Sequence, residues 1–369
     1  MTAVKVQKLS ITMGSDPEFF LAKRTMLGRV GAVVGSERAI PEEGMLHKII
    51  KQGRTAAEDE KAPRVIRDGF QVEINPLQNT CRQSGANDIA YCFRGLATVL
   101  KEKGYTINFS PTVKVTKKEM ESLSNKSRMF GCTPSKNAYG EVVELPDPET
   151  YLIRAAGGHI HLGTPFKTGN DPSIKVLKQT DVTEVIKILD IIAGNTCVLV
   201  DRDPGNIERR KAYGRAGEYR QPSHGIEYRV LSNFWLRNYT VMSMAFGLCR
   251  MAIEIAAVPE AAKAFLKAVK EKDIQDAINN NDFELAKKNF NKIKPLIEKY
   301  MTDGNVLCKN FLENFEYFIT KDLKYWFKQS PLAHWSRTGF SAMNRDGWER
   351  FIGPGGRVED ERLSETKKA

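Results

Sequence analysis

The sequence predicts an α+β protein, with strands and helices in mixed order and not in strict βαβ units. Strand-like segments occur near the N-terminus and again in the middle of the chain, and stretches of helical periodicity separate them. The composition is that of a globular protein, because 41% of the 369 residues are hydrophobic and 27% are charged. A chain of this length buries a core without disulfides or metal staples.

Short apolar segments and one helical pattern predict the N-terminal elements. Ile89 and Phe93 belong to an apolar series at helical spacing, and Gly104 follows it as the expected C-cap residue. Asn75 and Pro76 end the strand that precedes this helix. The expected elements are a strand at 9–21, its hairpin partner at 30–34, a long loop over 36–64, a strand at 69–74, a helix at 86–103 and a strand at 112–115.

The middle of the chain alternates strands with apolar helices. Asp181, with Glu184 three residues later, resembles the start of a capped helix. Pro259 marks a break after a largely apolar helix. The expected elements are a strand at 151–162 that contains a double glycine, a helix at 182–200, a strand at 226–231 and a helix at 238–257.

The pattern of charged and apolar residues changes after Pro259. Lys, Glu and apolar residues alternate through 260–328, which predicts two or three amphipathic helices, and the charged tail from about 357 is expected to be disordered. The chain therefore divides into a first domain at 1–258, a helical accessory region at 259–330 and a C-terminal segment at 331–369.

The charge and the cysteines exclude several classes of protein. The formal net charge is +11, but no run of five like charges occurs, so nucleotide phosphates are as good an explanation as a nucleic acid. The six cysteines contain no CxxC pair, which argues against zinc ribbons and redox dithiols. Cys197 and Cys249 are expected in the core, and Cys132 stays open as a nucleophile. No membrane span or secretory signal is recognised, so a cytoplasmic location is expected.

Two acidic patterns lie on predicted strands. Asp16 and Glu18 are two residues apart, so we expect both carboxylates on one face, where a hard divalent ion such as Mg²⁺ or Mn²⁺ would relieve their repulsion. Gln71, Glu73 and Asn75 form a second polar face. Each pattern is also typical of an exposed strand face, so the residues alone leave both interpretations open.

Two of the five histidines, His159 and His161, lie two apart between glycines, in the run GGHIHLG at 157–163. Imidazoles that share a strand face serve as metal ligands or phosphate donors. Glycines inside a strand often mark the close approach of a ligand or of another backbone. This pair is therefore a candidate functional site.

An arginine-rich segment follows, with the sequence RRKAYGRAGEYRQPSHGIEYRVLSN at 209–233. Arginine is the preferred bidentate donor to phosphate or carboxylate. Glu227 and Arg229 share a strand face, which would place a carboxylate for a cation beside a guanidinium for an anion. A salt-bridged surface loop is the alternative. Taken together, the four clusters predict a site for a metal-bound nucleoside triphosphate, held without a P-loop.

These motifs, in this order, resemble the glutamine synthetase and glutamate–cysteine ligase superfamily of carboxylate–amine ligases, most closely its bacteriophage-encoded amidoligase branch. The matching stretches are SDPEFFL at 15–21, GFQVEIN at 69–75, GGHIHLG at 157–163, RRKAYGRAGEYR at 209–220 and GIEYRVLSNFW at 225–235. The resemblance implies a curved antiparallel sheet that forms an active-site funnel in the first domain, with helices outside. It also implies ATP and Mg²⁺ or Mn²⁺ as cofactors.

The resemblance also implies roles for individual residues. The implied metal ligands are Asp16, Glu18, Glu73, His159 and Glu227. The implied contacts to the nucleotide or the transferred phosphoryl group are His161, Arg209, Arg220 and Arg229, with Arg210 as an alternative to Arg209. Glu218 is a candidate to take the proton from the amine. Asp16 stands where the family usually has Glu, and only Asp68 is a candidate for a further acid that the family places before the Q-x-E motif.

The resemblance thus implies an ATP-dependent ligase that forms an amide through an acyl phosphate, from small-molecule or peptide carboxylates and amines. A nucleic acid stays open as the acceptor, although no motif supports it, and the sequence does not give the oligomeric state. Two other functions stay open. One is a basic nucleic-acid-binding or structural protein on an inactive ligase fold, and the other is a metal hydrolase that uses the H-x-H motif.

Overall fold

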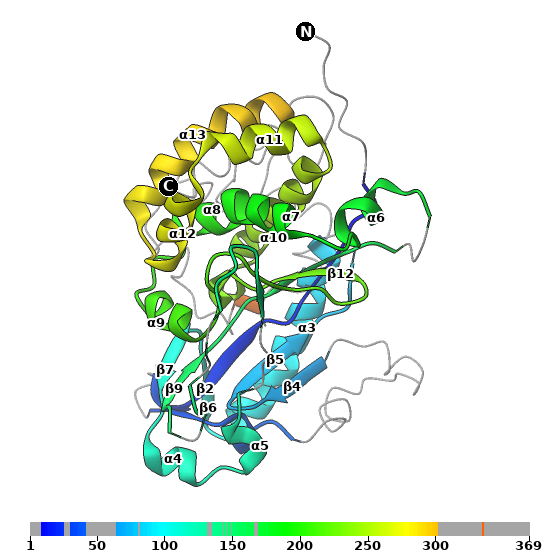
Figure 1. Cartoon of the computed structure of the whole chain (residues 1–369). Helices are drawn as coiled ribbons and strands as arrows, with labels where there is room; N and C mark the ends of the chain where they lie inside the picture. The colour runs from blue at the N-terminus through cyan, green and yellow to red at the C-terminus, as the bar shows by residue number, and fades with distance from the viewer. Residues whose placement is uncertain are drawn as a thin grey trace, which may run out of the picture.

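A computed structural model describes residues 9–25, 30–41, 64–79, 82–130, 135–142, 144, 146–148, 150–165, 169–301 and 334–335. Most strands gather at one end of the molecule and many of the helices at the other (Figure 1). All strand pairs in this part of the chain are antiparallel. The predicted α+β class, with antiparallel sheets and a helical C-terminal region, is confirmed.

Two five-stranded sheets form the framework. The first has the order β1 (Thr12–Ser15), β10 (Ile160–Gly163), β12 (Gly225–Tyr228), β11 (Glu218–Arg220) and β8 (Lys136–Asn137). The second contains β3 (Val30–Val34), β2 (Glu18–Arg24), β5 (Gln71–Asn75) and β4 (Arg64–Asp68) in that order, with β6 (Tyr105–Asn108) also paired to β2. A smaller ribbon pairs β7 (Thr112–Lys114) with β9 (Ile153–Ala155).

The chain passes from the first sheet to the second at Asp16 and Pro17. We expected one strand over 9–21, and the structure divides it into β1 and β2. Proline has no backbone N–H and a fixed φ, so a strand ladder is readily interrupted there. The interruption places Asp16 and Glu18 at the junction between the two sheets.

The strand predicted at 151–162 is also two strands, β9 and β10. The intervening glycines make close contacts within the protein: a Cβ on Gly157 would lie 2.3 Å from His159 Nε2, and one on Gly158 would lie 2.3 Å from Ser232 O. The close approach that we expected at these glycines is therefore to the protein's own side chain and backbone. The double glycine lets His159 pack inward.

Helices cover the sheets and build the core. The long ones are α3 (Arg82–Glu102), α10 (Tyr239–Ala256) and α13 (Phe283–Met301). The helix predicted at 182–200 is observed as α7 (Thr183–Leu189) and α8 (Asn195–Val198), joined by the π-helical turn η2 (Asp190–Gly194). The shorter helices are η1 (Ser36–Arg38), α4 (Lys117–Glu121), α5 (Asn125–Arg128), α6 (Pro172–Leu177), α9 (Gly205–Ala212), η3 (Asn233–Arg237), α11 (Pro259–Ala268) and α12 (Glu271–Asn279).

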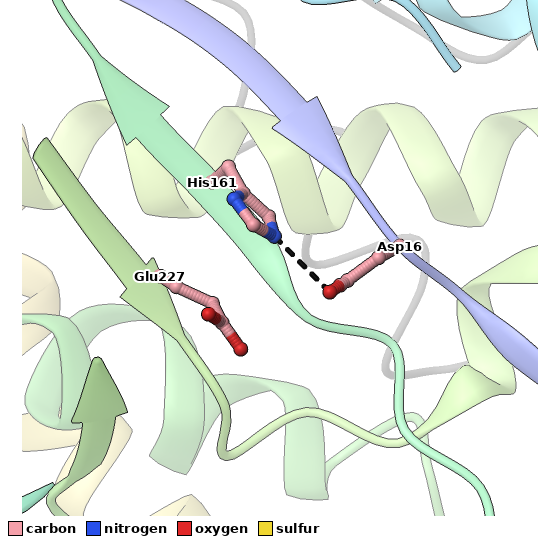
Figure 2. Close-up of side chains that lie close together, drawn as sticks. All are labelled: Asp16, His161 and Glu227. Carbon is pink, nitrogen blue, oxygen red and sulfur yellow. Dashed lines mark ion pairs between the residues drawn. The ribbon is translucent and has the colours of Figure 1, made fainter. Parts of the chain in front are cut away.

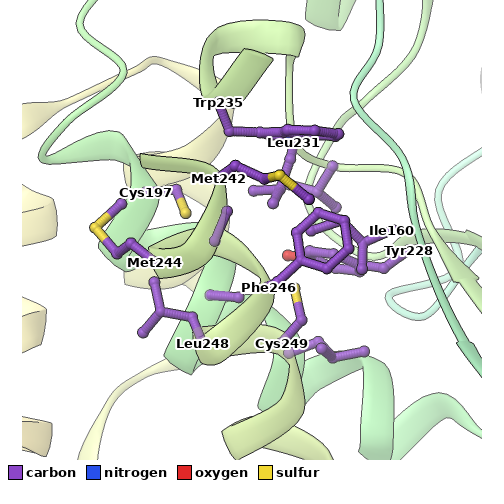
Figure 3. Packing of buried hydrophobic residues seen from close by; sticks show 14 of the residues in the cluster. Ile160, Cys197, Tyr228, Leu231, Trp235, Met242, Met244, Phe246, Leu248 and Cys249 are labelled. Atoms are coloured by element: carbon purple, nitrogen blue, oxygen red, sulfur yellow. The ribbon is translucent and has the colours of Figure 1, made fainter. Parts of the chain in front are cut away.

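The apolar core lies around α10. Met242 and Phe246 of this helix, with Trp235 of η3, pack against Ile160 and Tyr228 of the central strands (Figure 3). These side chains are fully or almost fully buried. Cys197 and Cys249 lie in this core as predicted. The core therefore supports the strands that bear the histidine and glutamate motifs.

Helices α11, α12 and α13 follow Pro259, where we predicted amphipathic helices. Asn195 of α8 donates to the carbonyl of Ala286 at 3.0 Å, and Asn289 of α13 donates to Asn195 Oδ1 at 3.1 Å. These two asparagines are fully buried. The helical region is thus joined to the first part of the chain by buried hydrogen bonds as well as by apolar packing. The predicted domain boundary at 258 stays a prediction.

Some expectations fall outside the described residues. They are most of the loop over 36–64, Cys132, the helical pattern beyond 301 and the tail from 357. Within the described residues, no single helix has the length and hydropathy of a membrane span; α10 and α11 reach the threshold only as a pair, Val241–Ala256 with Pro259–Ala268, across a bend of 115°.

Candidate active site

Strand register brings the polar motifs together from distant parts of the chain. In the first sheet, His161 pairs with Gly14 on one side and with Glu227 on the other, and Glu227 pairs in turn with Arg220. In the second sheet, Glu18 pairs directly with Glu73. Since residues that are directly opposite in neighbouring strands share a face, each sheet presents its polar side chains as a row.

The first group contains Asp16, His161 and Glu227, whose nearest ligand atoms all lie within 4.8 Å of one another (Figure 2). Asp16 also lies between the two histidines, with Oδ1 3.2 Å from His159 Nδ1 and Oδ2 3.2 Å from His161 Nε2. His159 Nδ1 is in addition 3.7 Å from Glu227 Oε1. The structure thus brings together four of the predicted site residues.

The electrostatics of this group follow from its geometry. Burial alone would raise the pKa of Asp16, but His159 and His161 outweigh it and hold the pKa well below its usual range. Burial likewise opposes charge on His161, yet Asp16 raises the pKa of this imidazole. The aspartate is therefore a stable anion among imidazoles.

The second group consists of three acids, Glu18, Asp68 and Glu73, again with ligand atoms within 4.8 Å of one another. Burial and the neighbouring carboxylates raise the pKa of Asp68 to about 7 and that of Glu73 to about 10. Asp68, the candidate for the further acid that the resemblance implies, thus lies beside Glu18 and Glu73. Asp16 and Glu18 belong to different groups of ligand atoms, but Asp16 lies close enough to the second group to add, after burial, to the raised pKa of Asp68 and of Glu73.

Both groups fit divalent cations by their donor chemistry. Carboxylate oxygens are the preferred ligands of Mg²⁺ and Mn²⁺, and an imidazole suits Mn²⁺ as well. Among the described residues, Asp16 Oδ1 and His161 Nε2 are buried atoms without a hydrogen bond of good geometry. Three clustered carboxylates repel one another unless protons or a cation neutralise them. The arrangement can therefore hold one ion in each group.

Two arginines adjoin Glu227, as the spacing predicts for one of them. Arg229 Nε lies 3.1 Å from Glu227 Oε1, and Arg220 Nη1 lies 3.4 Å from the same oxygen. Arg229 is almost completely buried and also donates from Nη1 to Ser135 Oγ at 2.6 Å. The structure thus places positive charge directly beside the first acidic group.

Within the described residues, Arg209 makes its hydrogen bonds to backbone carbonyl groups and none to the acidic groups. Its guanidinium is fully buried and donates to the carbonyl oxygens of Arg229, Val230 and Leu231 at 2.9–3.0 Å. From α9 the side chain thus reaches the backbone that follows β12. The structure therefore assigns Arg209 to the support of the chain that follows Glu227.

Arg210 and Glu218 also make backbone or structural contacts. Arg210 donates to Asn281 Oδ1 at 3.1 Å, and burial, with Arg209 next to it, lowers its pKa to about 10. Glu218 accepts hydrogen bonds from the backbone N–H groups of Gly214 at 2.9 Å and Arg215 at 3.3 Å. The expected nucleotide contact of Arg210 and proton transfer by Glu218 have no geometric support here.

Two residues that the sequence did not single out belong to the site. Tyr213 donates its hydroxyl hydrogen to Glu18 Oε2 at 2.7 Å. His224 stacks on His161 with ring centroids 5.2 Å apart, and its Nε2 lies 3.1 Å from His161 Nδ1. Both residues lie inside the arginine-rich segment, but nothing in their spacing separates them from ordinary loop residues.

A cavity of about 240 Å³ opens beside both groups. Its lining residues include Thr12, Ser15, Glu73, Gln78, His161 and His224. Most of the lining residues have polar side chains, and they come from β1, β5, β10 and the segments next to these strands. The cavity therefore offers hydrogen-bonding groups immediately next to the histidine and acid clusters.

Comparison with known proteins gives one family and a distant structural match. The model of the family "phage phiEco32-like COOH.NH2 ligase-type 2" matches residues 149–332, which include the histidine pair and the arginine-rich segment. No curated protein matches the chain. A solved structure of a GmaS/ADP complex, in its conformation 1, is similar, with 12% identity, coverage of 86% of this chain and 71% of that chain, and a TM-score of 0.38.

Proposed function

Over residues 149–332 the chain belongs to the phage phiEco32-like COOH.NH2 ligase-type 2 family, and on this premise we propose that it uses ATP to join a carboxylate to an amine. The observation on which the proposal rests is the pair of adjacent donor groups, one of Asp16, His161 and Glu227 and one of Glu18, Asp68 and Glu73. Arginines border the first of them.

The chemistry explains why such a site is needed. A carboxylate is a poor electrophile, because resonance and its negative charge oppose attack by an amine. Transfer of the γ-phosphoryl group of ATP to a carboxylate oxygen gives an acyl phosphate and ADP. The amine nitrogen then attacks the acyl carbon, phosphate leaves with the electrons of the C–O bond, and the nitrogen loses a proton to give the amide.

In this proposal the acidic groups hold Mg²⁺ or Mn²⁺. The ligands are Asp16, His159, His161 and Glu227 in one group and Glu18, Asp68 and Glu73 in the other. A bound divalent ion neutralises charge that builds up on the phosphoryl oxygens. The residues of this chain fix the positions of those charges before substrate arrives.

Arg220 and Arg229 complete the proposed phosphoryl site. Glu227 holds both guanidinium groups at 3.1–3.4 Å, so their remaining N–H groups have a restricted direction. Preorganised donors stabilise developing charge without the cost of rearrangement during the reaction. The cavity beside the two groups, lined in part by Gln78 and His224, would admit the nucleotide.

Release of ADP tests the proposal. The purified protein is incubated with ATP, Mg²⁺ or Mn²⁺, and pairs drawn from amino acids, short peptides and polyamines. A productive pair increases ADP release, and Glu18→Ala and Glu227→Ala each abolish it while the circular dichroism spectrum stays unchanged. If no carboxylate and amine pair stimulates ADP release, the proposed ligase activity is wrong.

The same assay separates the two other functions. A metal hydrolase would turn over without ATP. A nucleic-acid-binding protein on an inactive fold would bind DNA with an affinity that falls steeply with salt, and would release no ADP.

A further inference from the structure

Tyr213 contacts Glu18 of the second donor group and two residues beside the first group, His159 and Arg229. Its hydroxyl donates to Glu18 Oε2 at 2.7 Å. Its ring meets the imidazole of His159 edge to face, with centroids 5.8 Å apart and an interplanar angle of 69°. The guanidinium carbon of Arg229 lies 5.4 Å from the ring centroid. One side chain thus contacts an acid, an imidazole and an arginine of the candidate site.

The hydroxyl acts on one defined oxygen of Glu18. Glu18 Oε2 also accepts a hydrogen bond from the backbone N–H of Gly157 at 2.6 Å. Two donors on the same oxygen fix the rotation of the carboxylate, because either one alone would leave the plane free to turn. Hydrogen bonds to a ligating carboxylate of this kind orient it toward the ion.

The ring itself is held by the surrounding chain. Arg209 lies with its guanidinium carbon 4.7 Å from the ring centroid, and its three carbonyl partners keep it there. The next residue is Gly214, with φ of +81°, and a Cβ at that position would lie 2.1 Å from Arg209 Nη1. Only glycine fits this turn, so the backbone that presents Tyr213 has little freedom.

We infer that Tyr213 is a positioning residue, whose hydroxyl orients the Glu18 carboxylate for a divalent cation and whose ring links that carboxylate to His159 and Arg229. The inference rests on the proposed function, since it assigns an ion to the acidic group that contains Glu18. Tyr213 acts through Glu18 and is not itself a ligand of the ion or of the substrate.

Mn²⁺ binding in the absence of nucleotide and substrates tests the inference. Tyr213→Phe removes only the hydroxyl and keeps the ring contacts, so we expect Mn²⁺ to bind about tenfold more weakly by calorimetry, as is typical when an outer hydrogen bond to a ligand is lost. Tyr213→Leu removes the ring as well, and should bind Mn²⁺ no more tightly than the Phe variant. Thermal unfolding of the metal-free proteins checks that the Phe variant keeps the parent fold.

Tyr151→Phe is the matched control. Tyr151 also donates a hydroxyl hydrogen to a glutamate, Glu208 Oε1 at 3.2 Å, but outside the two donor groups. This variant should bind Mn²⁺ like the parent. Equal Mn²⁺ binding by Tyr213→Phe and the parent overturns the inference, and so does an equal loss in Tyr151→Phe.

The results also separate this inference from the proposed ligase activity. A parent protein that binds Mn²⁺ but releases no ADP with any pair contradicts only the ligase proposal. A parent that binds no Mn²⁺ contradicts both. A parent that binds Mn²⁺ and turns over, with a Phe variant of undiminished Mn²⁺ affinity, contradicts only the role of Tyr213.

Discussion

The carboxylate of Asp16 lies 3.2 Å from Nε2 of His161, although 144 residues of sequence lie between the two. The second oxygen of the same carboxylate reaches His159 at the same distance. A single anion therefore organises both imidazoles of the H-x-H motif. We therefore expect the arrangement of both imidazoles to change when the charge of Asp16 is removed.

Asp16→Asn should lower ADP release by about 100-fold, the scale on which the loss of one preorganised charged group reduces turnover. The amide keeps the shape of the side chain but cannot stay anionic between the histidines. Asp181→Asn is the control, because Asp181 accepts a hydrogen bond from the backbone N–H of Thr183 at a helix start. An Asp16→Asn enzyme of normal turnover would remove this residue from the site.

Arg229→Lys should reduce kcat by at least about tenfold, because lysine lacks the planar fork that contacts Glu227 and Ser135 together. Because lysine keeps the positive charge, a lower kcat would result from the loss of the two directed contacts with Glu227 and Ser135. Arg250→Lys is a matched control: Arg250 is buried and pairs with Glu254 at 3.0 Å on α10. Steady-state ADP release for both variants decides between geometry and charge.

Arg209→Met should destabilise the protein by about 3 kcal/mol or more, since three buried carbonyl groups lose a charged donor. Urea unfolding measures this loss. The KM for ATP of the folded fraction should stay within about twofold of the parent. A stable variant with a strongly raised KM would instead support the phosphoryl contact that the sequence resemblance implies.

Asp190→Asn should make stability less dependent on pH. Burial raises the pKa of Asp190 to about 7, although Tyr228, Tyr139 and Arg210 all face it and favour its charge. Between the ordinary carboxyl pKa of about 4 and this value, the folded protein binds the proton more tightly than the unfolded chain does, so the stabilising contribution falls as pH rises.

The amide that Asp190→Asn introduces needs no ionisation, and its oxygen can still accept the Tyr228 hydrogen bond, which is 2.6 Å long in the parent. The difference in unfolding free energy between variant and parent should therefore grow in favour of the variant from pH 4.5 to pH 8. Urea unfolding at both pH values measures it. A constant difference would contradict the raised pKa.

Asn281 allows a test of backbone strain in the turn between α12 and α13. Its φ is +51°, and its side chain accepts from Arg210 and donates to the carbonyl of Asp201 at 3.2 Å. Asn281→Gly and Asn281→Ala lose the same side-chain contacts, but alanine should be less stable by about 1 kcal/mol because of the left-handed conformation. Equal unfolding free energies would contradict the conformation.

The sequence predicted those parts of the site in which alternation along one strand decides the geometry. Glu227 and Arg229 share a face and meet at 3.1 Å, and the two histidines share Asp16. For Asp16 and Glu18 the expected shared face stays a prediction, although their ligand atoms fall in different groups. They also lie two residues apart, but Pro17 ends one strand and the chain enters another sheet. Alternation holds only while the strand continues.

The remaining site residues depend on contacts between distant segments, which spacing does not encode. Arg209 and Arg220 look equivalent in the sequence, yet one donates to three carbonyl groups and the other lies beside Glu227. Tyr213 and His224 acquire their contacts only when the turns after α9 and before β12 close over β2 and β10. Their chemistry is ordinary until the fold places them.

The turn between α12 and α13 also reaches the segment that presents Tyr213. Asn279 accepts a hydrogen bond from the backbone N–H of Ala216 at 2.8 Å, beside the contact of Asn281 with Arg210. A fragment that stopped after α10 would lack both contacts and would leave apolar surface of α10 and α7 without cover. The smallest part of this chain that we expect to fold with an intact candidate site therefore extends through α13. A chimera that joins the first part of this chain to the C-terminal helices of a relative would have to keep the contacts of Ala216 with Asn279 and of Arg210 with Asn281.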